Sequence, residues 1–207
     1  RDPETAYHWY SQAAAQMEPT AVFNLGYCYE EAIGVDKNTT EAVRLYRLAA
    51  NMGCCQAQNS LGYCYEDGIG VERNLEEALN YYRLAAQQGY PWAQCNLGFC
   101  LQNGIGTQPN FSEAAQWYLR AAIQGHARAQ HNYGYCLQNG VGVPKNAREA
   151  IRWYMMSAGQ SNSFAFHSLG YCFQFGVGVE QIDLAESFQW YQRAAMVNHI
   201  PAMLSLA

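Results

Sequence analysis

The sequence has few charged residues and no long apolar run. Asp, Glu, Lys and Arg make up 14% of the 207 residues, and the net charge is −5, whereas about a quarter of an average domain is charged. Nucleic-acid binding needs a basic stripe, so this composition excludes nucleic acid as a partner. No apolar run approaches the ~18 residues that span a membrane, so we expect no direct membrane insertion.

The spacings that mark metal sites and catalytic sites are also missing. No CxxC or HxxxH pair, which would suit zinc, occurs, and the glycine turns lack the Lys-Ser/Thr ending of a phosphate loop. Paired carboxylates such as Glu30-Glu31 and Glu66-Asp67 are explained as solvated helix ends, because no nucleophile with a base accompanies them. The sequence therefore predicts no metal, no cofactor and no enzymatic activity.

Aromatic residues and an internal repeat are what the sequence has instead. Sixteen residues are tyrosine, so many must lie at half-buried positions, where the ring packs and the hydroxyl stays in water. The tripeptide Gly-Tyr-Cys or Gly-Phe-Cys recurs every 36 residues, at Gly26, Gly62, Gly98, Gly134 and Gly170. A period of this length predicts an array of stacked supersecondary units.

Two further motifs complete each repeat. A Gly-Ile-Gly or Gly-Val-Gly turn begins at Gly68, Gly104, Gly140 and Gly176, and its first copy is Ala32-Ile33-Gly34. An aromatic pair then recurs at Trp9-Tyr10, Tyr81-Tyr82, Trp117-Tyr118 and Trp153-Tyr154, with Leu45-Tyr46 as a variant. The last pair, Trp190-Tyr191, comes one residue late, which indicates a single insertion after Val179.

Each repeat is predicted to form two helices, A and B. In the second repeat helix A spans roughly Gln56 to Asp67 and helix B about Leu75 to Gln88, and the turn glycines take the positive φ that reverses the chain. Helix B starts with a capping box, in which an Asn or Asp caps the helix and a Glu three residues later reaches back. The boxes are Asn38…Glu41, Asn74…Glu77, Asn110…Glu113, Asn146…Glu149 and Asp183…Glu186.

The predicted fold is therefore all-α, an α/α solenoid of about five 36-residue helix–turn–helix repeats with half a repeat at each end. Asp2-Pro3 is a further helix B start, and 200–207 lies inside a helix A, so we expect a piece of a longer array. The single array 1–207 is divided into helix B of a preceding repeat at 1–17, repeats at 18–53, 54–89, 90–125, 126–161 and 162–198, and the start of a further helix A at 199–207.

Gly62 and its equivalents lie inside helix A, where glycine costs roughly 1 kcal/mol relative to alanine. Because this glycine recurs five times, we expect a packing reason for it. The expected reason is close approach of helix B, aided by small residues at Ala42, Ala78, Ala114 and Ala150.

These motifs resemble the Sel1-like repeat, a relative of the tetratricopeptide repeat, over essentially the whole chain. The second repeat matches the pattern almost throughout, with Ala57-Gln58-Asn59-Ser60-Leu61-Gly62, Gly68-Ile69-Gly70-Val71, Glu77-Ala78 and Ala85-Ala86-Gln87-Gln88-Gly89. Departures are Ala32 for the turn glycine, Thr107 for Val and Ser157 for Ala. The resemblance implies a right-handed superhelix that serves as an adaptor for protein complexes, in settings such as membrane-protein quality control, cell-wall synthesis or signalling.

One arc of helix A is not needed for the core. On a helical wheel of the second repeat the core face holds Ala57, Leu61, Cys64 and Tyr65, and the opposite arc holds Gln56, Asn59, Tyr63, Glu66 and Asp67. In tetratricopeptide architectures this arc lines the concave surface. The position of Tyr63 is aromatic in every copy and forms the aromatic ladder, Tyr27, Tyr63, Phe99, Tyr135 and Tyr171. These rings either bind another chain or pack sideways on the neighbouring repeat.

Polar neighbours of the ladder complete a candidate groove. The position four residues before each ring varies, and His131 and His167 there are either pH-sensitive contacts or polar residues on an exposed face. The Asn or Ser that follows it either binds a ligand backbone or bonds within the stack, at Asn24, Ser60, Asn96, Asn132 and Ser168. The candidate partner-binding residues are Phe23, Tyr27, Glu30, Asn59, Tyr63, Glu66, Asp67, Phe99, Gln102, His131, Tyr135, Gln138, His167, Tyr171 and Gln174.

Five of the eight cysteines occupy one position per repeat, Cys28, Cys64, Cys100, Cys136 and Cys172. Equivalent positions in stacked helices lie roughly 10 Å apart, whereas a disulfide needs Cα atoms within about 7 Å, so we expect buried thiols. One bacterial branch of the Sel1-like family bridges two cysteines within each repeat, but the second series is missing here. A bond among Cys54, Cys55 and Cys95 stays open.

Reduced thiols favour the cytoplasm. The endoplasmic reticulum lumen is the alternative, because Asn38-Thr39-Thr40 and Asn110-Phe111-Ser112 are glycosylation sequons. Both sequons coincide with helix caps, which explain the Asn without glycosylation.

The sequence points to a non-catalytic scaffold that binds a partner peptide or domain in its concave groove. Residues 1–104 hold twelve acidic and six basic residues, and residues 105–207 hold five acidic and six basic ones. A complementary partner would therefore place a basic segment against repeats 1–2. The alternatives are a hydrolase of the type of the cysteine-rich bacterial relatives, and a purely structural spacer in a larger protein.

Overall fold

The computed structural model describes residues 2–197, which contain eleven α-helices and no strand. Helices B are α1 (Pro3–Ala14), α3 (Thr39–Asn51), α5 (Leu75–Gln87), α7 (Phe111–Ile123), α9 (Ala147–Ala158) and α11 (Leu184–Met196). Helices A are α2 (Pro19–Glu31), α4 (Cys55–Asp67), α6 (Pro91–Asn103), α8 (Ala127–Asn139) and α10 (Ser163–Phe175). The predicted start of a further helix A at 199–207 lies outside the described residues.

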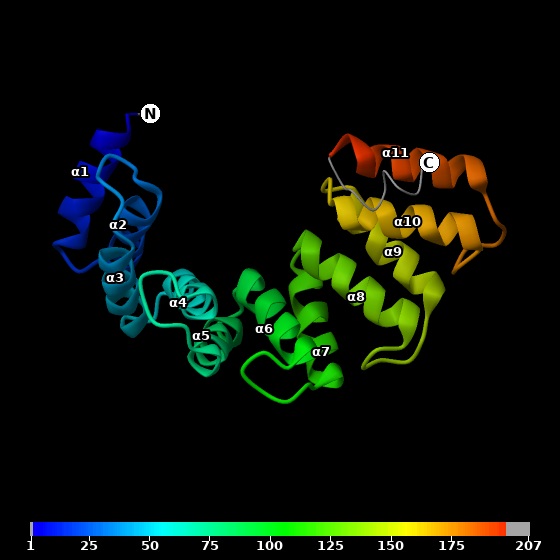
Figure 1. The fold of residues 1–207 in the computed structure, drawn as a ribbon, viewed down its shortest axis with the longest axis horizontal. Coiled ribbons are helices and arrows are strands. Elements are labelled where there is room, and N and C mark those ends of the chain that lie inside the picture. The colour runs from blue at the N-terminus through cyan, green and yellow to red at the C-terminus, as the bar shows by residue number, and fades with distance from the viewer. Residues whose placement is uncertain (1, 198–207) are drawn as a thin grey trace. The chain divides into compact units, whose positions relative to one another are not determined.

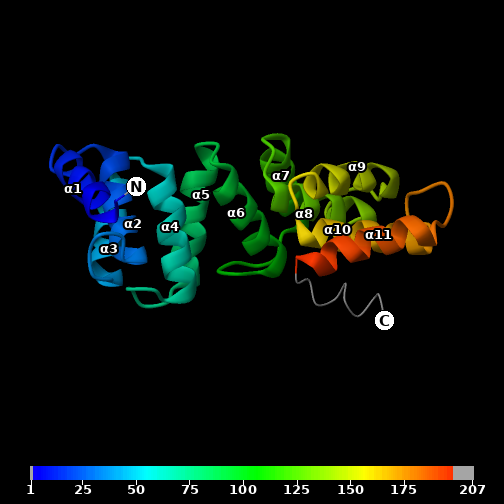
Figure 2. The ribbon, with the colours of Figure 1, turned by 90° about the horizontal axis from the view of Figure 1, so that it is seen from above.

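The chain forms two compact units, Arg1–Pro109 with α1–α6 and Asn110–Ala207 with α7–α11. Within the first unit α2 packs on α3 and α4 on α5, and within the second α8 packs on α9 and α10 on α11 (Figures 1 and 2). Contacts of α3 with α4 and of α9 with α10 then join successive repeats inside each unit. The predicted all-α repeat solenoid is confirmed, and the unit boundary falls inside the third repeat.

The helix starts follow the predicted caps, with one correction. Side chains of Asn38, Asn74, Asn110, Asn146 and Asp183 each accept a hydrogen bond from the backbone N–H of the Glu three residues later. The expected reach back of the Glu is observed in two repeats, where Oε2 of Glu113 and of Glu149 accepts from the side-chain amide of Asn110 and Asn146 at 3.2 and 2.9 Å. The backbone N–H of the cap, which the Glu was expected to bind, donates instead to a carbonyl of the preceding helix A, as in Asn74 to Tyr65 at 2.9 Å. The cap therefore ties the two helices of a repeat together.

The helix-A glycine makes room for a tyrosine ring of helix B. A Cβ built on Gly62 would lie 2.6 Å from the Tyr82 ring, and one on Gly134 would lie 2.7 Å from the Tyr154 ring. The expected close approach of helix B is confirmed. The ring of the buried tyrosine makes the closest contact, and the Ala150 carbonyl oxygen lies 3.3 Å from that Gly134 Cβ.

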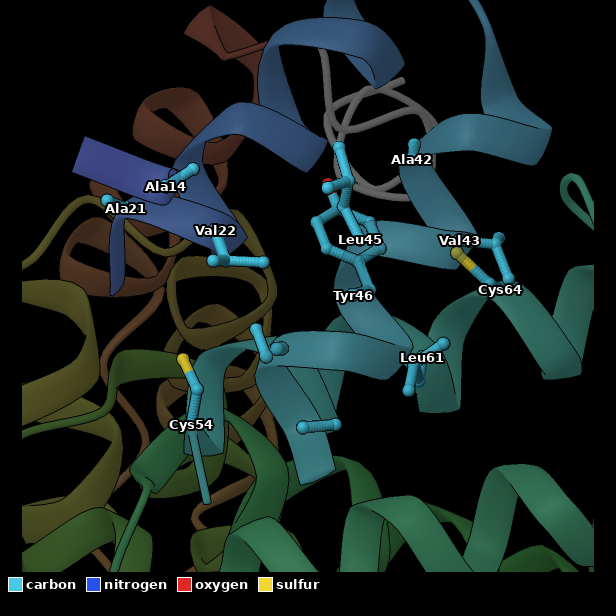
Figure 3. Packing of buried hydrophobic residues seen from close by; sticks show 13 residues of the cluster. Ala14, Ala21, Val22, Ala42, Val43, Leu45, Tyr46, Cys54, Leu61 and Cys64 are labelled. Carbon is cyan, nitrogen blue, oxygen red and sulfur yellow. The ribbon is translucent and has the colours of Figure 1, made fainter. Parts of the chain in front are cut away.

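The core of the first unit is built around one of these rings. Tyr46 is fully buried among residues of α2, α3 and α4, and Figure 3 shows it near Val22, Leu61 and Cys64. Ala57, Leu61 and Cys64 are buried as predicted, and Tyr65 is half-buried and stacks on Tyr81 with ring centroids 5.6 Å apart. The assignment of the core face of helix A is therefore correct, and it leaves Tyr63 outside.

The two glycines of each turn have different tasks. Gly68 ends α4 with φ 73°, and an added Cβ would find ordinary contacts. Gly70, with φ 65°, approaches the previous repeat so closely that a Cβ would lie 2.3 Å from the carbonyl oxygen of Thr39, at the start of α3. The first glycine reverses the chain, and the second seats the turn on the neighbouring repeat.

We expect Ala32→Gly to stabilise the protein. Ala32 ends α2 in the left-handed conformation, with φ 57° and ψ 41°, where a non-glycine residue costs about 1–2 kcal/mol. After the larger chain entropy of glycine is deducted, a net gain of roughly 0.5–1 kcal/mol remains, which a urea unfolding curve can measure. The matched control is Gly68→Ala, the reverse change in the next repeat, which should destabilise. Equal midpoints for all three proteins would contradict this account.

Candidate partner-binding face

Four of the five rings of the aromatic ladder are exposed to solvent. The exposed fractions are 46% for Tyr27, 47% for Tyr63, 46% for Tyr135 and 41% for Tyr171, whereas Phe99 is half-buried. In the second unit Tyr171 contacts Phe175, one turn further along α10, with ring centroids 4.7 Å apart. The ladder therefore presents large aromatic surfaces in both units, at the same position of each helix A.

In four repeats the Glu or Gln three residues after the ring is bound to the buried tyrosine of its own repeat. The hydroxyl of Tyr82 donates to Oε2 of Glu66 at 2.7 Å, that of Tyr154 to Oε1 of Gln138 at 2.8 Å, and that of Tyr191 to Oε1 of Gln174 at 2.9 Å. Tyr46 donates to Glu30 in the same way. These predicted groove residues are half-buried, and each has one oxygen committed to the core of its own repeat.

Burial of the tyrosine ring favours this arrangement. Burial and the neighbouring carboxylate raise the pKa of Tyr82, and burial raises the pKa of Tyr154. The hydroxyls therefore keep their protons at neutral pH and act as donors. Because each hydroxyl is a donor held in the core, the Glu or Gln that accepts its hydrogen bond must turn one oxygen inward.

In three repeats the residue four positions before the ring packs on the same buried tyrosine. Ring centroids of Phe23 and Tyr46 lie 5.5 Å apart, those of His131 and Tyr154 5.5 Å, and those of His167 and Tyr191 5.4 Å. All three side chains are half-buried, as is Asn59. The side chains at this variable position therefore contact the buried tyrosine and are also partly exposed at the surface.

The Asn and Ser series bonds within the stack at two places. Nδ2 of Asn96 donates to Oδ1 of Asn59 at 3.0 Å in the first unit. In the second unit Nε2 of His131 lies 3.0 Å from Oγ of Ser168. Of the two interpretations offered by the sequence, bonding between neighbouring helices A is therefore observed, and it aligns α4 with α6 and α8 with α10.

The first unit presents carboxylates beside its exposed rings. Glu31 and Asp67 are exposed, one residue beyond the bound Glu30 and Glu66. A hydrogen bond from Tyr63 to Asp67, together with the charge of this carboxylate, raises the pKa of Tyr63. In the second unit the matching positions carry Asn139 and the exposed Phe175.

A pocket of about 280 Å³ opens on this face in the second unit. The exposed rings of Tyr135 on α8 and Tyr171 on α10 line it, and so do Gln138 and His167. All four were predicted as partner-binding residues. Asn139, Ser168 and the hydroxyl-bearing Tyr154 complete the lining, so the pocket contains donors, acceptors and rings but no Asp, Glu, Lys or Arg.

Sequence reasoning missed one polar series, Gln58, Gln94 and Gln130, which is buried between repeats. Each side chain donates to a carbonyl near the end of the preceding helix B, as Gln130 does to Ala122 at 3.2 Å. Gln160 in turn donates to Gln130 at 2.9 Å. The recurrence of Gln directly after a buried Ala, every 36 residues, is the pattern that could have revealed it.

The cysteine series is buried as predicted, and the structure has all eight cysteines as thiols. Among residues 2–197 no group of three His, Cys, Asp or Glu residues could hold a metal ion. Within the same residues no helix is both long and apolar enough to cross a bilayer.

The fold and the exposed face define a class of protein, an α/α repeat array that displays one face of its helices A. The Sel1 repeat profile matches residues 1–16, 19–54, 55–90, 93–126, 127–162 and 166–199. The chain therefore belongs to the Sel1 repeat family, as the sequence motifs indicated. Sel1 repeat proteins generally mediate protein–protein interaction, and the family is typically non-catalytic.

Solved structures and a curated relative are similar to this chain. A Sel1 repeat protein from Oxalobacter formigenes is 34% identical with a TM-score of 0.89, covering 100% of this chain and 87% of that one. The protective antigen c5321 of uropathogenic Escherichia coli, which displays an SLR fold, is 32% identical with a TM-score of 0.85, covering 98% and 43%. DAP3-binding cell death enhancer 1 of Rattus norvegicus is 39% identical over 57 residues, which are 28% of this chain and 11% of that protein.

We expect the repeated cysteines to resist alkylation until the protein unfolds. Burial, the largest cause, raises the pKa of Cys64 and Cys172 to about 12 and that of Cys136 to about 11. At pH 8 only about one in a thousand to ten thousand of these thiols is a thiolate, and alkylation is slow because the thiolate is the nucleophile. Iodoacetamide labelling followed by mass spectrometry, with and without denaturant, measures this, and half-buried Cys55 is the internal reference.

Two results would show that this account of the cysteines is wrong. One is labelling of Cys64 as fast as Cys55 in the native protein. The other is a disulfide between any two members of the series.

Proposed function

We propose that this chain is a non-catalytic scaffold that binds an extended segment of a protein partner along its helix-A face. The exposure of Tyr27, Tyr63, Tyr135 and Tyr171 carries the proposal, because their repeats have complete cores without these rings. Aromatic residues with a large contact area are the common anchors of protein interfaces. The half-buried residues beside them supply oriented polar groups. Reduced thiols favour a cytoplasmic location for this scaffold.

The charge of the first unit supports a basic partner segment against repeats 1–2. Glu30 and Glu66 each give one carboxylate oxygen to a buried tyrosine, and the other oxygen remains for a ligand. Glu31 and Asp67 add exposed carboxylates next to Tyr27 and Tyr63. A Lys or Arg side chain there would meet a carboxylate and an aromatic face together, and a cation over an aromatic ring is attracted to it.

Truncation of a ladder ring should weaken binding without unfolding the protein. We expect Tyr63→Ala to weaken the complex by about 1 kcal/mol or more and to change the melting temperature little. Leu61→Ala, at a fully buried neighbour, should instead cost roughly 2–5 kcal/mol of stability. The partner is recovered with the full-length protein from its source cells, purified, and titrated against each variant.

The same titration covers Phe99→Ala, which should weaken binding as Tyr63→Ala does and should also lower the melting temperature somewhat, because Phe99 is half-buried. Loss of stability in Tyr63→Ala equal to that in Leu61→Ala would place the ladder in the core. Unchanged affinity in both ring variants would refute the proposed face.

Binding should also depend on salt through the first unit. Exposed charges are screened beyond about 8–10 Å at physiological ionic strength, so a basic segment should associate more slowly as salt rises. The variant that carries Glu30→Gln, Glu31→Asn, Glu66→Gln and Asp67→Asn copies the polar pair of the third repeat, Gln102-Asn103. It should remove most of the salt dependence measured by stopped flow. Association that ignores both salt and this replacement excludes the basic segment and leaves the ladder proposal standing.

A further inference from the structure

We propose that the pocket between α8 and α10 recognises the side-chain carboxamide of an Asn or Gln in the partner segment. This inference rests on the proposed function, because it assumes that a partner lies on the helix-A face. It adds the chemistry that the second unit selects, which differs from that of the first unit.

The orientation of Gln138 is set by groups beneath the pocket. The hydroxyl of fully buried Tyr154 donates to its Oε1 at 2.8 Å, and the thiol of buried Cys172 donates weakly to the same oxygen at 3.7 Å. Two donors hold this oxygen inward. The amide group Nε2 is therefore the part of Gln138 left to face the pocket, and it is a donor.

The matching position of the first unit has the opposite polarity. Glu66 accepts from Tyr82 at 2.7 Å with Oε2, so its second carboxylate oxygen is left for a ligand. The buried tyrosine is the same in both repeats, and the change from Glu to Gln replaces an outward acceptor by an outward donor. In the fifth repeat Gln174 accepts from Tyr191 at 2.9 Å in the same manner as Gln138.

An acceptor lies beside this donor. Nδ2 of Asn139 donates to the carbonyl oxygen of Tyr135 at 3.0 Å, which leaves Oδ1 of Asn139 at the rim of the pocket. Gln138 and Asn139 together offer one N–H and one oxygen. A carboxamide has one oxygen and one NH2 group, so it can bond to both residues.

The rest of the lining disfavours charged side chains. No Asp, Glu, Lys or Arg lines the pocket, and His167 is its one titratable residue apart from the tyrosines. A carboxylate or an ammonium that entered would lose water without meeting an opposite charge, and this loss is costly. A neutral amide, held between the rings of Tyr135 and Tyr171, avoids that cost.

The test uses a displayed library of random hexapeptides selected on the full 207-residue chain. We expect the selected peptides to be enriched in Asn or Gln at one position, and to need both Tyr135 and Tyr171 for binding. Gln138→Glu should keep the Tyr154 hydrogen bond, as Glu66 keeps that of Tyr82, and should shift the selection to Lys or Arg. Peptides selected on the wild type should bind Gln138→Glu roughly 3–10-fold more weakly, which corresponds to one lost hydrogen bond.

Gln116→Glu is the matched control, because it makes the same change at an exposed residue of α7 that does not line the pocket. It should leave the selection unaltered, and melting curves check that every variant folds. If peptides depend on Tyr135 and Tyr171 but Gln138→Glu selects the same residues, the amide inference is overturned and the proposed function stands. If no selected peptide depends on either ring, the proposed function itself fails in this unit.

Discussion

Each repeat depends on one contact, the ring of a helix-B tyrosine against a glycine of helix A. Because Gly62 and Gly134 have no Cβ, the rings of Tyr82 and Tyr154 lie directly on the helix-A backbone. Glycine inside a helix costs roughly 1 kcal/mol, and the buried ring more than offsets this, since a core aromatic residue contributes about 3–5 kcal/mol. The same ring carries a hydroxyl through the core to the opposite side, where it bonds to the residue that faces solvent.

This contact links the core to the candidate binding face. The tyrosine hydroxyl must find an acceptor, because a buried polar group without a partner is costly. The acceptor is Glu66 in the second repeat and Gln138 in the fourth, so one position of helix A serves both the core and the surface. Evolution can change a carboxylate into an amide there without loss of the core bond, and each repeat can present a different polar group to a partner.

Much of this could be predicted from the sequence because it is periodic. The recurrence of Gly62, Gly68 and Asn74 with their equivalents predicted the helix boundaries, the turns and the caps. The helical wheel placed Tyr63 outside the core, and its exposure confirms this position. Which atom of Glu66 or Gln138 faces outward could not be predicted, because a helical wheel gives only the direction of a side chain. It does not show the hydroxyl of Tyr82 or Tyr154, which reaches this position from another helix. Gln130 was missed for a similar reason, since its carbonyl partner lies in the preceding repeat.

The most direct test of the account is photo-crosslinking from single positions. A benzophenone amino acid is placed at Tyr27 or Tyr63 on helix A, and at Leu84, a similarly exposed residue of helix B, in complex with the purified partner. Binding on the helix-A face predicts strong crosslinks to one partner segment from both tyrosine positions and none from Leu84. Crosslinks from Leu84 alone, or with equal yield from all three positions, would contradict binding on the helix-A face.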